Sequence, residues 1–184
     1  MTTYNKIEID GLDIFYREAG QGNRPKLLLL HGFPASSFMF RDLIEYLKCD
    51  FHLIAPDYPG FGLSDAPDRK TFSYSFDNLA DIIDKFTAKL GLTDLGLYMQ
   101  DFGGPVGFRL ASRHPEKVSF LVVQNANAYE EGLPDNFWSL AKTLWKDPSP
   151  ANFDKLREAA LSDEALAWNY AHGVDDQSRI SPDS

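Results

Sequence analysis

One junction constrains the fold of this chain more than any other feature. The segment Leu97–Gly107 begins with a short apolar run, continues with a single carboxylate, Asp101, and then has two glycines before a helix-like stretch. This pattern predicts a strand, a sharp turn and a helix, and glycine permits the backbone conformations that such a turn requires. Asp101 would then project from the tip of a sheet. An aspartate directly before a helix is also a favoured N-cap residue, so the junction alone leaves a purely structural role open.

The apolar periodicity of the first 126 residues predicts alternating strands and helices. The dipeptide Asp10-Gly11 between the first two strands favours a hairpin. Residues 26–30 are four leucines after a lysine, which is typical of a central parallel strand buried on both faces. Because strands and helices alternate along the chain, we expect a mostly parallel sheet flanked by helices. The expected strands are residues 6–9, 13–17, 26–30, 52–55, 96–100 and 118–124, and the expected helices are residues 37–48, 76–90 and 105–114.

The remaining residues, 127–184, have a different apolar pattern. This pattern predicts helices without strands, at roughly residues 135–145, 152–161 and 163–172. The sequence Pro148-Ser149-Pro150 separates the first two of these helices. We therefore expect a second, all-helical part of the chain that begins near residue 127.

Composition excludes several classes of protein. The formal net charge of −9 argues against a nucleic-acid partner or an anionic membrane surface, because both require clustered Lys and Arg. The longest fully apolar run, Leu27–Leu30, is far too short to span a bilayer, and the polar start of the chain shows no signal peptide. Cys49 is the only cysteine, so neither an internal disulfide nor a cysteine-rich zinc site is possible. A cytoplasmic protein is expected.

A second motif, His31-Gly32-Phe33-Pro34, follows the strand expected at residues 26–30. The carboxyl ends of parallel strands line the crevice where ligands bind in open α/β sheets. A tight loop there leaves backbone N–H groups free to donate hydrogen bonds to an oxyanion. The backbone amide of Phe102, the residue after the displayed carboxylate, would be a second such donor. Alone, the motif could equally be a strand-to-helix turn in which His31 is structural. Its position 70 residues before Asp101 favours a functional site.

Together with the segment Asp57–Asp65, these motifs resemble the α/β-hydrolase fold superfamily, and within it the branch of epoxide hydrolases and haloalkane dehalogenases. The segments His31–Pro34, Asp57–Asp65 and Gln100–Gly104 occur in the order found in that branch. The resemblance covers residues 1 to about 126 and implies an α/β-hydrolase fold, with residues 1–126 as the N-terminal part of the core. Residues 127–184 resemble the beginning of the family's helical cap.

The resemblance implies a two-step reaction on a small electrophilic substrate, without cofactor or metal. Asp101 would attack carbon and form an alkyl-enzyme ester, and a histidine-activated water would hydrolyse it. The backbone amides of Phe33 and Phe102 would form the oxyanion hole, in which one donor is worth roughly 3 kcal/mol.

Two departures from the family pattern bear on the substrate. Haloalkane dehalogenases typically hold the halide with a tryptophan after the nucleophile and a second donor, often asparagine, in the His-Gly loop. Phe102 and Phe33 stand at these places and offer no side-chain N–H, which favours an epoxide-hydrolase-like activity. Epoxide hydrolases also usually have tryptophan at the position of Phe102. They protonate the epoxide oxygen with cap tyrosines, for which Tyr129 and Tyr170 are candidates, although a helical tyrosine is more often packing.

None of the four histidines is well placed as the base. In the family, the catalytic acid, the base and the last strands of the sheet follow the cap, so the resemblance implies that they would lie after residue 184. We expect the 184-residue chain to show weak or no steady-state turnover of substrate. Dehalogenation of haloalkanes or haloacids and a non-catalytic, α/β-hydrolase-like binding module remain alternatives, and the oligomeric state is open.

Overall fold

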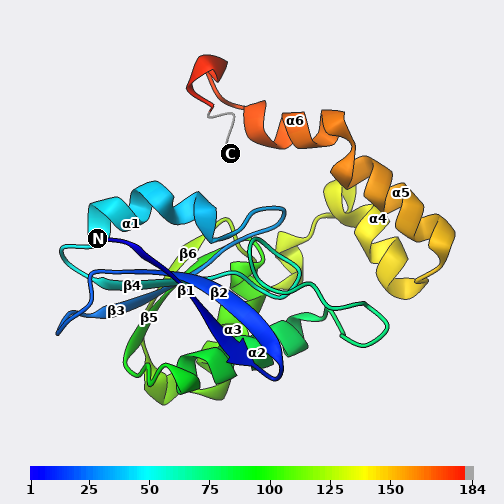
Figure 1. Cartoon of the computed structure of the whole chain (residues 1–184). Helices are drawn as coiled ribbons and strands as arrows, with labels where there is room; N and C mark the ends of the chain where they lie inside the picture. Colours follow the sequence, from blue (N-terminus) through cyan, green and yellow to red (C-terminus); the bar gives the residue numbers. More distant parts are fainter. Residues whose placement is uncertain (181–184) are drawn as a thin grey trace. The chain divides into compact units, whose positions relative to one another are not determined.

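The computed structural model describes residues 1–180, and its contacts divide the chain into two compact units, residues 1–128 and 129–184 (Figure 1). The first unit holds a six-stranded sheet in the order β1-β2-β4-β3-β5-β6. β1 and β2 form an antiparallel hairpin and β2 is antiparallel to β4, whereas β3, β4, β5 and β6 are mutually parallel. The predicted α/β fold with a mostly parallel sheet is confirmed. The strands are β1 (Thr3–Ile9), β2 (Leu12–Ala19), β3 (Lys26–Leu30), β4 (His52–Pro56), β5 (Leu95–Gln100) and β6 (Val118–Gln124).

The predicted hairpin is present at Asp10-Gly11. Both residues have positive φ angles, 52° and 79°, as in the type I′ turns that match the twist of paired strands. The two strands are longer than predicted, because their pairing runs from Ile9–Leu12 at the turn to Thr3–Glu18 at the far end.

Leucines alternate between the two faces of the sheet, as the period of a strand requires. Leu28 and Leu30 of β3 contribute to one apolar cluster with buried residues of α2 (Phe76–Lys89) and α3 (Gly103–Arg113). Leu27 and Leu29 contribute to a second cluster with α1 (Arg41–Leu47). Figure 1 shows α1 on one side of the sheet and α2 and α3 on the other. The four leucines are 3% exposed or less, so β3 is buried on both faces as predicted.

Two helices of the first unit differ from the prediction at their starts. The helix predicted at residues 37–48 begins as a 3₁₀ turn, Ser37–Phe40, and becomes α-helical only at Arg41. α3 begins at Gly103, two residues before the predicted Pro105. Proline is tolerated there because the first N–H groups of a helix have no intrahelical partner.

β6 forms an edge of the sheet that the described residues make. Its four central side chains are apolar and point to both faces, and their exposed fractions are between 38% and 48%. These residues are Phe120, Leu121, Val122 and Val123. The opposite edge strand, β1, carries Lys6 and Glu8 among its exposed positions. The two edges of the sheet therefore differ strongly in polarity.

The second unit is helical throughout its described residues, as predicted. It contains α4 (Asp135–Lys146), α5 (Pro150–Leu161) and α6 (Asp163–Ala171), together with short 3₁₀ turns. α5 begins at Pro150, earlier than predicted, since proline fits the first helical position. Ala141 is the one buried apolar residue among the described residues of this unit. No helix within residues 1–180 is long and apolar enough to cross a membrane.

Candidate active site

Asp101 lies in the turn between β5 and α3. Its φ angle of +48° is in the left-handed region, which aspartate tolerates better than most residues. The Gly104 N–H donates to the Asp101 carbonyl oxygen at 2.9 Å and closes the turn. Phe102, not Asp101, is the N-cap residue of α3, and no side chain caps this helix. The capping interpretation of Asp101 is therefore wrong, and its carboxylate is directed elsewhere.

Glycine allows the backbone to come close on both sides of Asp101. A Cβ on Gly103 would lie 2.2 Å from the carbonyl oxygen of Leu30. A Cβ on Gly32 would lie 2.7 Å from the Cβ of Asp101. The loop after β3 and the turn after β5 can therefore touch only because these two positions lack a side chain.

The Phe33 amide N–H donates a hydrogen bond of 2.8 Å to Oδ1 of Asp101, although the two residues are 68 positions apart. The parallel pairing of Leu30 with Met99 brings these two strand ends together. The peptide bond between Phe33 and Pro34 is cis. The structure thus brings together Asp101, Phe33 and Phe102, and the rings of the two phenylalanines stack with centroids 5.3 Å apart.

Four phenylalanines form an aromatic cluster beside Asp101. The ring of Phe102 contacts Phe76 at 4.9 Å and Phe61 at 6.3 Å between centroids, in addition to Phe33. Phe61 and Phe33 also meet edge to face at 6.3 Å. Since none of these side chains carries an N–H or O–H, the cluster gives the site apolar surface and no side-chain donor. Phe61 and Phe76 were not predicted as site residues, although Phe61 lies within the family segment Asp57–Asp65.

Asp57 stabilises the loop that carries Phe61. Its buried carboxylate accepts hydrogen bonds from the backbone N–H groups of Ser37 at 2.7 Å and Leu63 at 2.9 Å. Its carbonyl oxygen accepts a third bond, from the Ser64 hydroxyl. A buried carboxylate is stable when it is hydrogen-bonded in this way. Asp57 therefore has a structural role at the site.

His31 is fully buried and both of its ring nitrogens have partners. Nδ1 lies 2.9 Å from the carbonyl oxygen of Gly32, and Nε2 lies 3.3 Å from the amide nitrogen of Tyr58. A carbonyl accepts and an amide donates, so we assign the proton to Nδ1 and the lone pair to Nε2. Burial lowers the pKa of His31, against smaller opposing effects of the Gly32 carbonyl and of Asp57 and Asp101. His31 is thus a neutral structural residue and not a base for water.

The other histidines are also held by partners. His52 lies 2.7 Å from Glu18, and His114 lies 2.8 Å from Asp84. His172 belongs to the second unit, where its ring stacks on Trp168. Within residues 1–180, no cluster of three His, Cys, Asp or Glu side chains is arranged to hold a metal ion.

Tyr129 and Tyr170 lie in the second unit. Tyr129 precedes a 3₁₀ turn, Glu130–Gly132, and is 78% exposed, while Tyr170 lies on α6 and is 41% exposed. Their assignment as proton donors stays a prediction.

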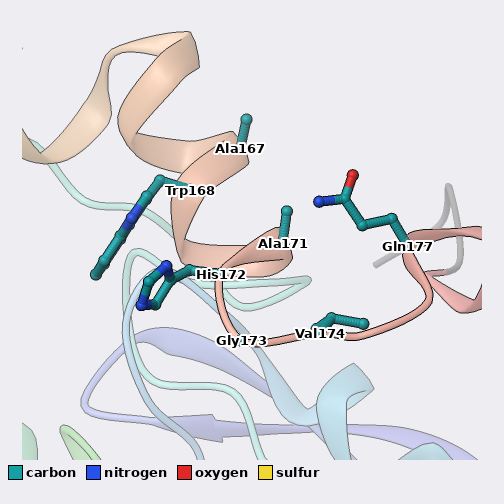
Figure 2. Close-up of a pocket in the computed structure, with 7 residues that line it drawn as sticks. All are labelled: Ala167, Trp168, Ala171, His172, Gly173, Val174 and Gln177. Carbon is teal, nitrogen blue, oxygen red and sulfur yellow. The ribbon is translucent and has the colours of Figure 1, made fainter.

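A shallow hollow of about 440 Å³ lies at the end of α6 (Figure 2). Trp168 and His172 line one side of it, with ring centroids 4.5 Å apart, and Gln177 lies opposite. None of the predicted site residues lines this hollow. This hollow therefore does not contain the predicted site residues.

A parallel-centred sheet in which a strand–turn–helix junction displays one side chain beside the loop of a neighbouring strand defines an α/β-hydrolase core. Residues 25–171 match the family model described as alpha/beta hydrolase fold. The chain therefore belongs to the α/β-hydrolase fold family, and the predicted resemblance is confirmed.

The chain is also similar to individual proteins of known sequence or structure. It is 48% identical over 182 residues to an uncharacterized hydrolase of Saccharomyces cerevisiae, covering 97% of this chain. It is 40% identical over 112 residues, 61% of this chain, to haloalkane dehalogenase 2 of Mycobacterium tuberculosis. A mutant of the Vigna radiata epoxide hydrolase superposes with a TM-score of 0.61 and 28% identity, over 66% of this chain and 38% of that one. The alignments span 62% of the length of the yeast relative and 38% of that of the dehalogenase.

Proposed function

We propose that this chain carries the nucleophile of an epoxide-hydrolase-like enzyme, and that Asp101 forms an alkyl-enzyme ester with a small electrophile. The observation that carries the proposal is the 2.8 Å hydrogen bond from the Phe33 amide to Oδ1 of Asp101, whose backbone is held in the left-handed turn. An N-cap would direct its carboxylate to the helix instead. We further propose that residues 127–184 are the beginning of a helical cap domain.

The hydrogen bond suggests a division of roles between the two carboxylate oxygens. Attack by Oδ2 on an epoxide carbon would form one C–O bond and break another, and the electron pair of the broken bond would go to the epoxide oxygen. Oδ1 would then be the carbonyl oxygen of the ester. When water adds to that carbonyl, the Phe33 amide, and by the family analogy the Phe102 amide, would stabilise the negative charge on it.

The leaving group distinguishes the proposed function from dehalogenation. The identity to a haloalkane dehalogenase favours a halide as the alternative leaving group. The aromatic cluster opposes it, because Phe33 and Phe102 offer no side-chain N–H to a departing anion. An epoxide oxygen stays attached to the substrate and needs one proton, for which Tyr129 and Tyr170 are the proposed donors.

Intact-mass spectrometry after incubation with styrene oxide or 1-bromobutane tests both candidates. We expect styrene oxide to add one equivalent of its own mass at Asp101, located by peptide mapping, and 1-bromobutane to react far more slowly. Asp101→Asn should abolish the adduct. Asp94→Asn is the matched control, because Asp94 has a similar φ angle of 57° and should not be needed for the reaction. Adduct formation that is undiminished in Asp101→Asn would contradict the proposal.

The same samples separate the enzyme from a binding module. A non-catalytic module would bind the epoxide reversibly and form no adduct. Because the histidines of the first unit all have other partners, we expect the ester to accumulate instead of being hydrolysed. Release of several equivalents of diol per chain would show that a water-activating base is present after all.

A further inference from the structure

Gln100, the last residue of β5, places a carboxamide beside the carboxylate of Asp101. Gly32 has no Cβ, and both groups lie close to the point that a Cβ on Gly32 would occupy. Oε1 of Gln100 is 2.1 Å from this point, and Oδ1 of Asp101 is 3.0 Å from it. The two oxygen atoms therefore lie no farther apart than the sum of these distances, about 5 Å. The missing side chain of Gly32 is what allows the carboxamide and the carboxylate to converge on one place.

The carboxamide of Gln100 is available to act on Asp101. The side chain is half-buried, and no hydrogen bond of its carboxamide to another group is found within residues 1–180. Gln124 pairs in register with Gln100 on the neighbouring strand β6, and its Oε1 accepts a hydrogen bond from the hydroxyl of Tyr98. The two glutamines thus occupy matching places on parallel strands, but the carboxamide of Gln124 is already engaged.

A carboxamide beside a carboxylate is most favourable when its N–H groups face the charge, because hydrogen bonds to an ionised acceptor are the strong ones. The two ends of a carboxamide have nearly the same shape, so a half-turn about the last side-chain bond exchanges Oε1 for Nε2 at the same place. Oδ1 of Asp101 already accepts a hydrogen bond from the Phe33 amide. A donor from Gln100 would therefore join the Phe33 amide at the same oxygen.

We propose that Gln100 is a further donor of the oxyanion hole, in which its Nε2–H group donates to Oδ1 of Asp101. This inference rests on the proposed function, in which Oδ1 becomes the carbonyl oxygen of the ester. When a nucleophile adds to that carbonyl, negative charge collects on Oδ1, and a donor already aimed at this oxygen stabilises the charge. Gln100 thus supplies a side-chain N–H that Phe33 and Phe102 lack, and it acts on the ester and not on the leaving group.

The test measures cleavage of the ester by added hydroxylamine, which needs no base from the protein. The chain is first loaded with styrene oxide. The hydroxylamine nitrogen then attacks the ester carbon and gives up a proton to the departing oxygen, so that the diol leaves and Asp101 becomes a hydroxamate. Gln100→Met removes the N–H donors and keeps an unbranched side chain of similar length. We expect cleavage to slow by roughly a hundredfold, as when one side-chain donor of an oxyanion hole is lost. The adduct should still form at nearly the unsubstituted rate, because Oδ2 is the attacking atom.

Gln124→Met is the matched control, because Gln124 has the same place on β6 and its carboxamide is bound to Tyr98. It should leave both rates unchanged. Unchanged cleavage in Gln100→Met would overturn the proposal. Equal slowing of adduct formation and of cleavage would also overturn it, because a disturbed turn would then explain the result.

A second measurement needs neither the substitution nor the adduct. In the unsubstituted chain, an Nε2–H group of Gln100 at Oδ1 lies beside the Phe33 N–H, which donates to the same oxygen. Protein labelled with ¹⁵N should therefore show a nuclear Overhauser effect between these two groups, and its absence would overturn the proposal. This effect without any epoxide adduct keeps the place of Gln100 and rejects the nucleophile. An adduct that is cleaved equally fast in Gln100→Met keeps the nucleophile and rejects the Gln100 donor.

Discussion

His31 shows how one buried side chain connects the stability of the fold to the site. It is neutral, it holds the amide of Tyr58, and it lies next to the glycine that contacts Asp101. Adding a proton to Nε2 would replace a hydrogen-bond acceptor with a donor that faces another donor. The native state therefore resists protonation at this position.

This resistance predicts how stability depends on pH. Burial lowers the pKa of His31 in the folded chain below its usual value of 6.5, so the unfolded chain binds more protons below that pH. The contribution of His31 to stability is fully present above about pH 6.5 and is lost as the pH falls below it. The loss is at most about 1.4 kcal/mol per pH unit. Urea unfolding between pH 5.5 and 7.5 measures it.

His31→Gln should flatten this pH dependence, because the titrating group is removed. His172→Gln, which removes another imidazole from the second unit, is the matched control. If the free energy of unfolding depends equally on pH in the unsubstituted chain and in His31→Gln, other titrating groups are responsible for that dependence.

Sequence reasoning placed some site residues better than others. The family motifs predicted that Asp101, Phe33 and Phe102 lie close together, and the structure brings them together because they follow the ends of two paired parallel strands. The tautomer of His31 was not predictable. It depends on a contact between residues 27 positions apart, and no spacing or periodicity encodes such a contact.

At the scale of elements, β6 has the features of a strand that can pair with a further strand. It is an edge strand of the described sheet, and its central residues are apolar on both faces and without charge or proline. Natural sheets usually protect edges with charges, particularly lysine. We expect the 184-residue chain to self-associate reversibly as its concentration rises.

Val123→Lys should weaken this association without unfolding the chain, because Val123 is 48% exposed. Sedimentation velocity over a hundredfold range of concentration measures the effect. Thr3→Lys adds the same charge to the opposite edge strand, β1, and should leave the association unchanged. Equal association of both variants would mean that the contact lies elsewhere.

The elements that could be predicted are those in which one physical signal dominates. α2 has a regular apolar stripe, and the structure gives it the predicted start and nearly the predicted end. The starts of α1 and α3 were misplaced, because the hydrogen bonds of the first turn decide them and apolar periodicity does not. In the first case Ser36 accepts from the Phe38 amide and fixes a 3₁₀ turn.

At the scale of the whole molecule, the two units have very different interiors. The first unit has apolar clusters on both faces of its sheet, whereas Ala141 is the one buried apolar residue among the described residues of the second. Large aromatic side chains of the second unit, Phe137, Trp145 and Trp168, are more than half exposed. Regions with few buried apolar contacts open at low free-energy cost.

Limited proteolysis should therefore cleave the second unit first. We expect the earliest cuts by a nonspecific protease to fall after residue 124, leaving a resistant fragment that contains β1 to β6. Mass spectrometry of early time points identifies the cuts. First cuts within the strands or within α2 and α3 would contradict this order of stability.

The unequal edges of the sheet also limit the stoichiometry of any association. A sheet with two bare edges can add further copies at each end and grow into a fibre. The described sheet has one bare edge, β6, while β1 carries exposed charged residues. Two copies that pair through β6 would each present only a charged edge to the solvent, so growth by this route would end at the dimer.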